Sequence, residues 1–151
     1  MPFRFSLQPL LNWKRSLEDQ SQMRLAGLMT RLKTQEEEIE RLTLQRLASE
    51  QKLKEKSEQG IRAGEYLLFK QFADESRKEL ISQEDEKKRI LGEIDQERKN
   101  LLALTKEKKT LERLKEKQFK EFLSRLEKAE QKRVDETTTL KYQPRSGGET
   151  S

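Results

Sequence analysis

The side chains of this sequence that could do acid–base or metal chemistry are mainly carboxylates and amines. The chain has 28 Asp and Glu and 33 Lys and Arg residues, but it contains neither cysteine nor histidine. It therefore lacks a thiol nucleophile, an imidazole base and the usual ligands of a zinc site. The densest acidic run is Glu36-Glu37-Glu38. A catalytic carboxylate needs a desolvated cleft that shifts its pKa, so the chemistry of this run depends on the elements that hold it.

The composition predicts long helices rather than a globule around a broad core. Charged residues make up 40% of the chain and hydrophobic residues 31%, with only six glycines and three prolines. So few apolar residues can be buried only as a narrow stripe along a helix. A thin helical structure offers no deep cleft, so we predict that residues 36–38 form a solvated face. We expect no enzymatic activity, no cofactor and no metal site.

Apolar residues recur at helical spacing from about residue 7 to residue 53. The stripe contains Leu25, Leu28, Leu32, Ile39 and Leu42. Steps of three, four and seven are those of a heptad seam, and Gln35 occupies the core position that the apolar residues skip. Arg46 and Ser49 also lie on this seam. Pro9 is tolerated only in the first turn, so we expect the helix to begin between residues 6 and 10.

A second stripe follows in the other half of the chain. It contains Ile90, Ile94, Leu101, Leu104 and Leu111 and continues with Leu114, Phe122 and Leu126. Acid–base pairs four residues apart flank both stripes, among them Glu37/Arg41, Asp95/Lys99 and Glu116/Lys120. Such pairs support a helix on its solvent face. Both halves are therefore predicted to be helical.

A bend is predicted near residues 57–66, where Gly60 and Gly64 weaken a helix. Folding there gives an all-α, long antiparallel two-helix coiled-coil hairpin, with one arm at about 7–57 and the other at about 66–142. We expect residues 1–142 to form a single domain and residues 143–151 to be a disordered tail. The alternative is one continuous rod that dimerises in parallel through the same stripe.

The aromatic residues gather near the expected helix ends. They are Phe3, Phe5 and Trp13 at the start, Tyr66, Phe69 and Phe72 after the bend, and Phe119 and Phe122 late in the second arm. Core packing and partner binding both explain aromatic residues at such places. We expect Phe72 to be exposed, on the same helix face as Phe69.

Charge and hydropathy argue against nucleic acid and membrane as partners. The net charge is +5, and in the most basic stretch, residues 106–120, acids are interspersed among the bases. That pattern indicates a solvated surface rather than a field aimed at phosphates. No apolar run is long enough to span a bilayer, and the start does not resemble a signal peptide, so we expect no membrane insertion and a cytoplasmic protein.

Three regions of the chain, its start, its middle and its end, resemble one known family. The opening Phe3–Leu7 is similar to the start of many FliJ proteins, and Gly60-Ile61 with the later run Phe69–Phe72 is similar to their bend. Near the end, Glu107–Lys117 and Glu130–Glu136 resemble the closing "KK.LE.L.E" and "EQK..DE" patterns of the family. Together the segments extend over nearly the whole chain.

The resemblance implies a function in flagellar type III protein export. FliJ proteins are antiparallel two-helix coiled coils similar to the central shaft of rotary ATPases. The resemblance implies a soluble, non-enzymatic stalk of the hexameric export ATPase, which also contacts the export-gate membrane protein and export chaperones. The expected location is the cytoplasm, peripheral to the inner membrane at the flagellar basal body.

The resemblance also implies two sets of binding residues. The end formed by both termini would enter the ATPase ring, through Phe3, Phe5, Lys132, Arg133, Asp135 and Glu136. Contacts with the export gate would lie nearer the bend, at Phe69 and Phe72. Two alternatives stay open: the equivalent stalk of a virulence-type injectisome, and a plain structural homodimeric coiled coil.

Overall fold

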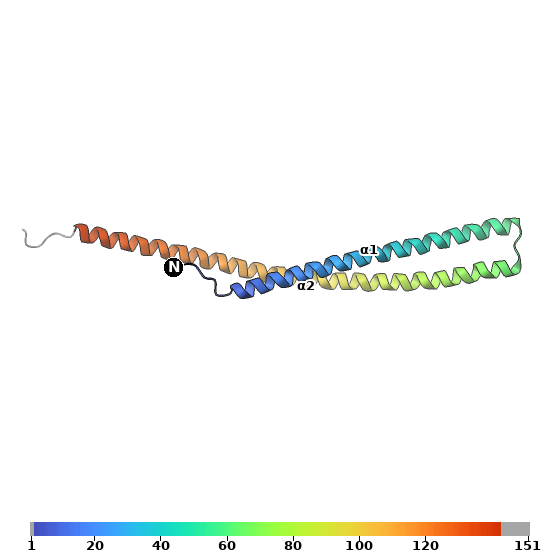
Figure 1. Cartoon of the computed structure of the whole chain (residues 1–151), viewed down its shortest axis with the longest axis horizontal. Coiled ribbons are helices and arrows are strands. Elements are labelled where there is room, and N and C mark those ends of the chain that lie inside the picture. Colours follow the sequence, from blue (N-terminus) through green and yellow to red (C-terminus); the bar gives the residue numbers. More distant parts are fainter. Residues whose placement is uncertain (1, 143–151) are drawn as a thin grey trace, which may run out of the picture. The chain divides into compact units, whose positions relative to one another are not determined.

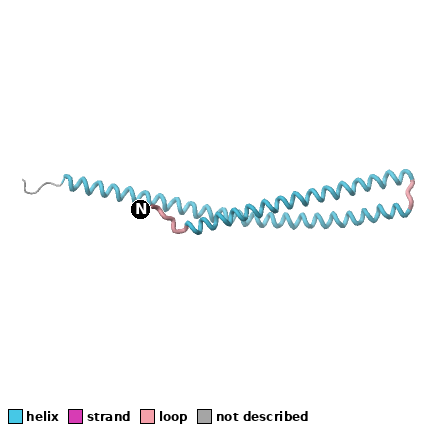
Figure 2. Tube along the Cα trace, viewed as in Figure 1, coloured by secondary structure: helices cyan, strands magenta, loops and turns pink. Residues whose placement is uncertain are grey.

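The chain folds into two long helices that pack antiparallel. The computed structural model describes residues 2–142, with α1 at Gln8–Gln59 and α2 at Ala63–Tyr142, joined by a short loop (Figures 1 and 2). The predicted all-α antiparallel hairpin is thus confirmed, and the single continuous rod is wrong. The predicted disordered tail, residues 143–151, lies outside the described residues.

The two helices contribute to two compact units. One unit combines Met1–Arg15 with Lys106–Ser151, and the other is Ser16–Thr105. Each unit contains a stretch of α1 and a stretch of α2, so each has its own interhelical packing. That residues 1–142 form a single domain stays a prediction.

The bend lies within the predicted range and depends on one glycine. Gly60 follows the last residue of α1 and has a φ of 92°, a left-handed conformation that glycine adopts without steric cost. Its N–H donates to the carbonyl of Ser57 at 3.4 Å. The second arm begins three residues earlier than expected, because Gly64 lies inside the first turn of α2 rather than in the loop. The N–H of Tyr66 closes that turn by donating to the carbonyl of Arg62 at 3.0 Å.

The two glycines should respond to alanine in opposite ways. In both cases an added Cβ would meet nothing within 4 Å, so only backbone conformation matters. We expect Gly60→Ala to lower the free energy of unfolding by about 1–2 kcal/mol, the cost of a left-handed conformation for a residue with a Cβ. We expect Gly64→Ala to raise it by a few tenths to about 1 kcal/mol, because alanine favours the helix. Urea unfolding followed by circular dichroism measures both, and equal effects of the two variants would contradict the assignment.

The core of unit 16–105 is a narrow seam between the helices. Ile90, Ile94 and Leu104 are buried on α2, and the predicted seam residues of α1 are all half-buried. Gln35 lies on this seam, as its spacing predicted. Its Nε2 donates to the main-chain carbonyl of Gln83 at 2.8 Å, so the polar side chain is satisfied across the helix pair.

Polar contacts fix the register of the same unit. Ser21 is completely buried, and its Oγ donates to Oε1 of Glu97 at 2.6 Å. Nε of Arg24 lies 3.2 Å from the same oxygen. The hydrogen bond from Ser21 is the main reason why the pKa of Glu97 is lowered from its ordinary value, and Asn100 and Arg24 act in the same direction. A buried hydroxyl that must meet one particular carboxylate opposes a shift of one helix along the other.

In the other unit, the chain start packs along α2. Phe5 is only 4% exposed and Leu11 is completely buried. Nζ of Lys14 lies 2.6 Å from Oε2 of Glu107, and Nη2 of Arg15 lies 3.6 Å from Oε1 of Glu112. Helix α1 begins at Gln8 with Pro9 in its first turn, as predicted.

Of the three acid–base pairs named from the sequence, two form ion pairs in the structure. Asp95 pairs with Lys99 at 3.2 Å, and Glu116 with Lys120 at 3.3 Å, each four residues apart. The predicted pair between Glu37 and Arg41 is wrong. Arg41 instead pairs with Glu38. Its Nε donates to Oε2 at 2.9 Å and its Nη2 donates to Oε1, so the pair is bidentate.

Candidate partner-binding surfaces

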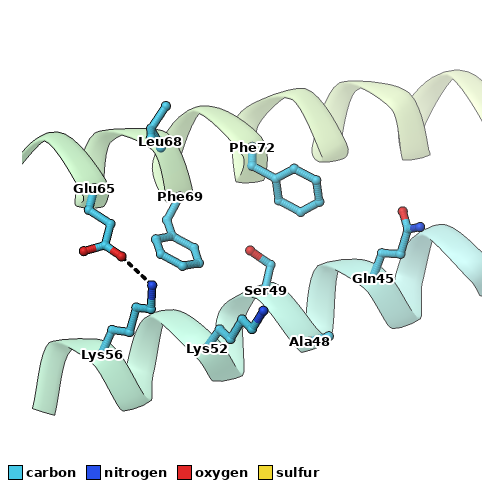
Figure 3. A pocket seen from close by; sticks show the side chains of 9 residues that line it. All are labelled: Gln45, Ala48, Ser49, Lys52, Lys56, Glu65, Leu68, Phe69 and Phe72. Carbon is cyan, nitrogen blue, oxygen red and sulfur yellow. Dashed lines mark hydrogen bonds and ion pairs between the residues drawn. The ribbon is translucent and has the colours of Figure 1, made fainter. Parts of the chain in front are cut away.

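A groove near the bend lies between the two helices of unit 16–105. It has a volume of about 680 Å³, within the range of ordinary binding pockets. Its lining consists of Gln45, Ala48, Ser49, Lys52 and Lys56 from α1 and Glu65, Leu68, Phe69 and Phe72 from α2 (Figure 3). The groove thus brings together two stretches of chain on either side of the bend.

The walls of this groove differ in chemistry. The rings of Phe69 and Phe72 point from α2 toward α1 (Figure 3). The Phe69 ring lies beside the Lys56 side chain, and the Phe72 ring lies on the side of Ser49. Phe72 is 40% exposed, as the sequence predicted, while Phe69 is half-buried. An apolar wall that stays open to solvent is typical of a surface that another protein covers.

The charged residues of the groove are unequally paired. Lys56 forms an ion pair with Glu65, and its Nζ lies 5.5 Å from the centroid of the Phe69 ring. Lys52 has no ion pair or hydrogen bond with any residue in the described part of the chain. Its ammonium group is therefore the groove's available charge.

The second candidate surface is the final stretch of α2. Every residue from 123 to 141 is exposed, although Leu123, Leu126 and Val134 are apolar. Figure 1 shows this stretch, in orange and red, continuing past the start of α1. At 1.5 Å per residue the bare helix is roughly 28 Å long. No segment among residues 2–122 covers it.

The predicted ring-binding residues do not form one cluster. Lys132, Arg133, Asp135 and Glu136 all lie on the bare stretch of α2. The ring of Phe3 instead packs edge-on against Phe119, with 5.3 Å between centroids, and 5.5 Å from Phe122. Residue 132 lies ten residues beyond Phe122, roughly 15 Å along the helix. The aromatic and charged members of the predicted set are therefore separate.

Phe5 has a different environment from that of the other predicted ring-binding residues. Because its side chain is buried against its own unit, it has little surface to offer a partner. Its structural contribution is to hold the chain start. Trp13, which the sequence grouped with it, is 55% exposed and lies beside the ammonium group of Lys14, with 4.9 Å from Nζ to the ring.

Sequence reasoning missed the α1 side of the groove. Ala48, Ser49 and Lys52 have no distinctive motif, and they face Phe69 and Phe72 only because the chain turns at residues 60–62. Counting residues equally in both directions from the bend would have placed them opposite each other. The sequence could therefore have revealed this pairing, but only if the position of the turn had been known to within one or two residues.

The described residues show no features of a metal or membrane site. Across residues 2–142, no three carboxylates gather so that they could hold a metal ion. Glu36, from the acidic run, lies 3.8 Å from Nζ of Lys87, so it faces a base. None of the helices in this part of the chain is apolar and long enough to cross a membrane.

A match to a family model identifies the family of this chain. The model described as "Flagellar FliJ protein" matches residues 3–147, which is nearly the whole chain. The chain belongs to the FliJ family. No curated protein and no solved structure matches it. FliJ proteins are components of flagellar protein export, and the family is non-catalytic. The resemblance seen in three segments of the sequence is confirmed, and the flagellar FliJ assignment favours the flagellar version over the injectisome alternative.

Proposed function

We propose that the chain is the central stalk of the hexameric flagellar export ATPase and links that ring to the export gate and to export chaperones. The observation that supports a stalk most directly is the bare stretch of α2, residues 123–141. A single helix exposed on all sides is narrow enough to enter the bore of a ring. Membership of the FliJ family supports the export apparatus as its setting.

The charge pattern of the bare stretch suits contact with a ring of identical subunits. Lys132 and Arg133 are followed by Asp135 and Glu136, so both signs occur within about one turn. Exposed ion pairs are individually weak, about 0.2–1 kcal/mol each. Weak polar contacts allow the helix to exchange between equivalent subunits, which one deep apolar contact would hinder.

The gate contact is proposed at the other candidate surface. Phe69 and Phe72 form the apolar wall of the groove near the bend, and the ring-binding residues lie in a different unit. Separate surfaces would let the chain hold both partners at once. Membership of the FliJ family supports the further proposal that the protein has no catalytic activity and works in the cytoplasm, at the inner-membrane side of the flagellar basal body.

The stalk proposal is tested by mixing the chain with its cognate export ATPase. We expect the chain to promote hexamer formation, measured by light scattering, and to raise the rate of ATP hydrolysis in parallel. If neither rises while the chain behaves as a stable dimer, the protein is a structural coiled coil and the proposal is wrong.

Charge reversal on the bare stretch should weaken this effect selectively. We expect Lys132→Glu/Arg133→Glu to reduce ring binding by about tenfold, because two charge pairs turn repulsive. The matched control is Arg77→Glu/Lys78→Glu, which reverses another exposed neighbouring pair on α2, in the other unit. Ring binding that is equal in the two double variants would show that residues 132 and 133 do not enter the ring.

A further inference from the structure

Buried side chains are unevenly distributed along unit 16–105. Those that are buried lie far from the bend and are Glu18, Ser21, Ile90, Ile94 and Leu104. The structure describes every residue from 22 to 89, and none of these side chains is buried. Because burial of apolar surface is the main driving force of folding, the two helices are held together least where they approach the bend.

Polar contacts between the helices show the same gap. No hydrogen bond or ion pair joins residues 37–55 of α1 to residues 66–82 of α2, both of which lie in the described part of the chain. We call these two stretches together the bend segment. Farther from the bend, Ser21, Arg24 and Arg31 each contact a glutamate of α2. Pairing within the bend segment therefore depends on apolar contacts alone.

The seam of the bend segment packs poorly. Arg46 and Ser49 lie on the α1 side of this seam, where a coiled coil usually has apolar residues. Nε of Arg46 is buried and makes no hydrogen bond within the described residues, with Oε1 of Glu50 3.5 Å away. A buried donor that is left unsatisfied is unfavourable. The groove of about 680 Å³ extends along much of the same stretches, so the two helices do not fill the space between them.

The contacts at the two ends of the bend segment differ in strength. At the bend, Lys56 pairs with Glu65, but both side chains are partly exposed, and exposed ion pairs contribute little. At the other end, Nε2 of the half-buried Gln35 donates to the main-chain carbonyl and to Oε1 of Gln83. Loss of these bonds would leave half-buried polar groups without partners, which costs more. Separation of the helices therefore begins at the bend and stops at Gln35.

We propose that the bend segment opens as a unit of its own, by separation of its two helices from the bend as far as Gln35, while the rest of unit 16–105 stays paired. Isolated helices are only marginally stable in water, so the separated arms also lose part of their helical structure. The register set by Ser21 and Glu97 is kept during this opening. The bend end of the hairpin thus changes shape without loss of the paired half. This property belongs to the chain alone and does not rest on the proposed function.

Hydrogen exchange of the full chain, measured by mass spectrometry at several low urea concentrations, tests the opening. We expect amides of the bend segment to be about a hundredfold less protected than amides of residues 90–104. Urea should change exchange in the bend segment only slightly, because its opening exposes little surface, and should raise exchange of residues 90–104 steeply. Equal protection and equal urea dependence of the two regions would show that the unit opens only as a whole, and the proposal would be wrong.

Removal of one methyl group in the paired half provides a second test. Ile94 is 2% exposed and stays buried while the bend segment opens. We expect Ile94→Val to lower the protection of residues 90–104 about fivefold and to leave the bend segment as it is in the wild-type chain. A loss of protection of the same size in both regions would contradict an independent opening.

A stabilising variant should close the bend segment. Arg46→Leu removes the unsatisfied guanidinium nitrogen and places an apolar side chain on the seam, so it should raise the protection of the bend segment about tenfold. The matched control is Lys54→Leu, which replaces an exposed base of the same stretch and should change the protection by less than about twofold. If the two variants slowed exchange equally, the seam at Arg46 would not limit the opening and the proposal would be wrong.

Discussion

Replacing Ile94 by alanine is expected to lower the free energy of unfolding of unit 16–105 by about 2–4 kcal/mol. Ile94 is 2% exposed and is one of the few fully buried apolar side chains of a narrow seam. A broad core can relax around a cavity, but two helices in contact along one line have few neighbours that can move in. The loss is a large fraction of the 5–15 kcal/mol by which proteins are usually stable. Urea unfolding followed by far-ultraviolet circular dichroism measures it.

The matched control is Leu91→Ala on the same helix. Leu91 is 44% exposed. Both substitutions remove the same number of carbon atoms, so they differ only in whether the side chain is buried. We expect a change within about 0.5–1 kcal/mol, as for other partly exposed sites. If both variants lost the same stability, the seam of α2 would have to be assigned to a different helix face.

Replacing Phe5 by alanine is expected to release the chain start from α2, at a local cost of about 3 kcal/mol. Phe5 is buried, and the preceding Phe3 reaches Phe119 and Phe122 only if the segment stays in place. Hydrogen exchange should become faster at the amides of residues 8–15 and 106–122. Amides of residues 63–80, in the other unit, should be unchanged, because local opening need not spread.

A second substitution separates packing from direct binding at this residue. Phe5→Leu keeps an apolar side chain in the core and should retain most of the protection and of the ATPase stimulation. In that case Phe5 supports ring binding by packing the chain start. If Phe5→Leu keeps its hydrogen-exchange protection and loses ring binding, the direct contact implied by the family resemblance is right.

The sequence predicted the helices well because each is set by local chemistry. Pro9 limited where α1 could begin, and Gly60 supplied the left-handed residue that ends it. Heptad spacing placed Gln35 on the seam without any knowledge of Gln83, which accepts its hydrogen bond. Gly64 was misjudged because a glycine weakens the interior of a helix but is tolerated in its first turn, and spacing alone does not distinguish the two.

The candidate sites were only partly predictable for the same reason. The aromatic side of the groove was apparent from the spacing of Phe69 and Phe72. Lys52 and Ala48 could not be predicted as part of the groove, because lysine and alanine are common in this charged helix. Only the residues opposite them show that they line a groove. The sequence also grouped Phe5 with Lys132, although one is buried in the chain start and the other lies on the bare stretch of α2.

By itself, the sequence determined that this protein is helical, which faces of the helices are apolar, where the chain turns and to which family it belongs. These properties follow from residue periodicity, glycine and proline geometry and motif order, all of which act over a few neighbouring residues. Only the tertiary structure decided which side chains of α1 meet which of α2, that Phe5 is buried, and which residues of the longer arm, 123–141, are bare. Those properties depend on the register between the helices, which is fixed by contacts such as Ser21 with Glu97 between residues far apart in the chain.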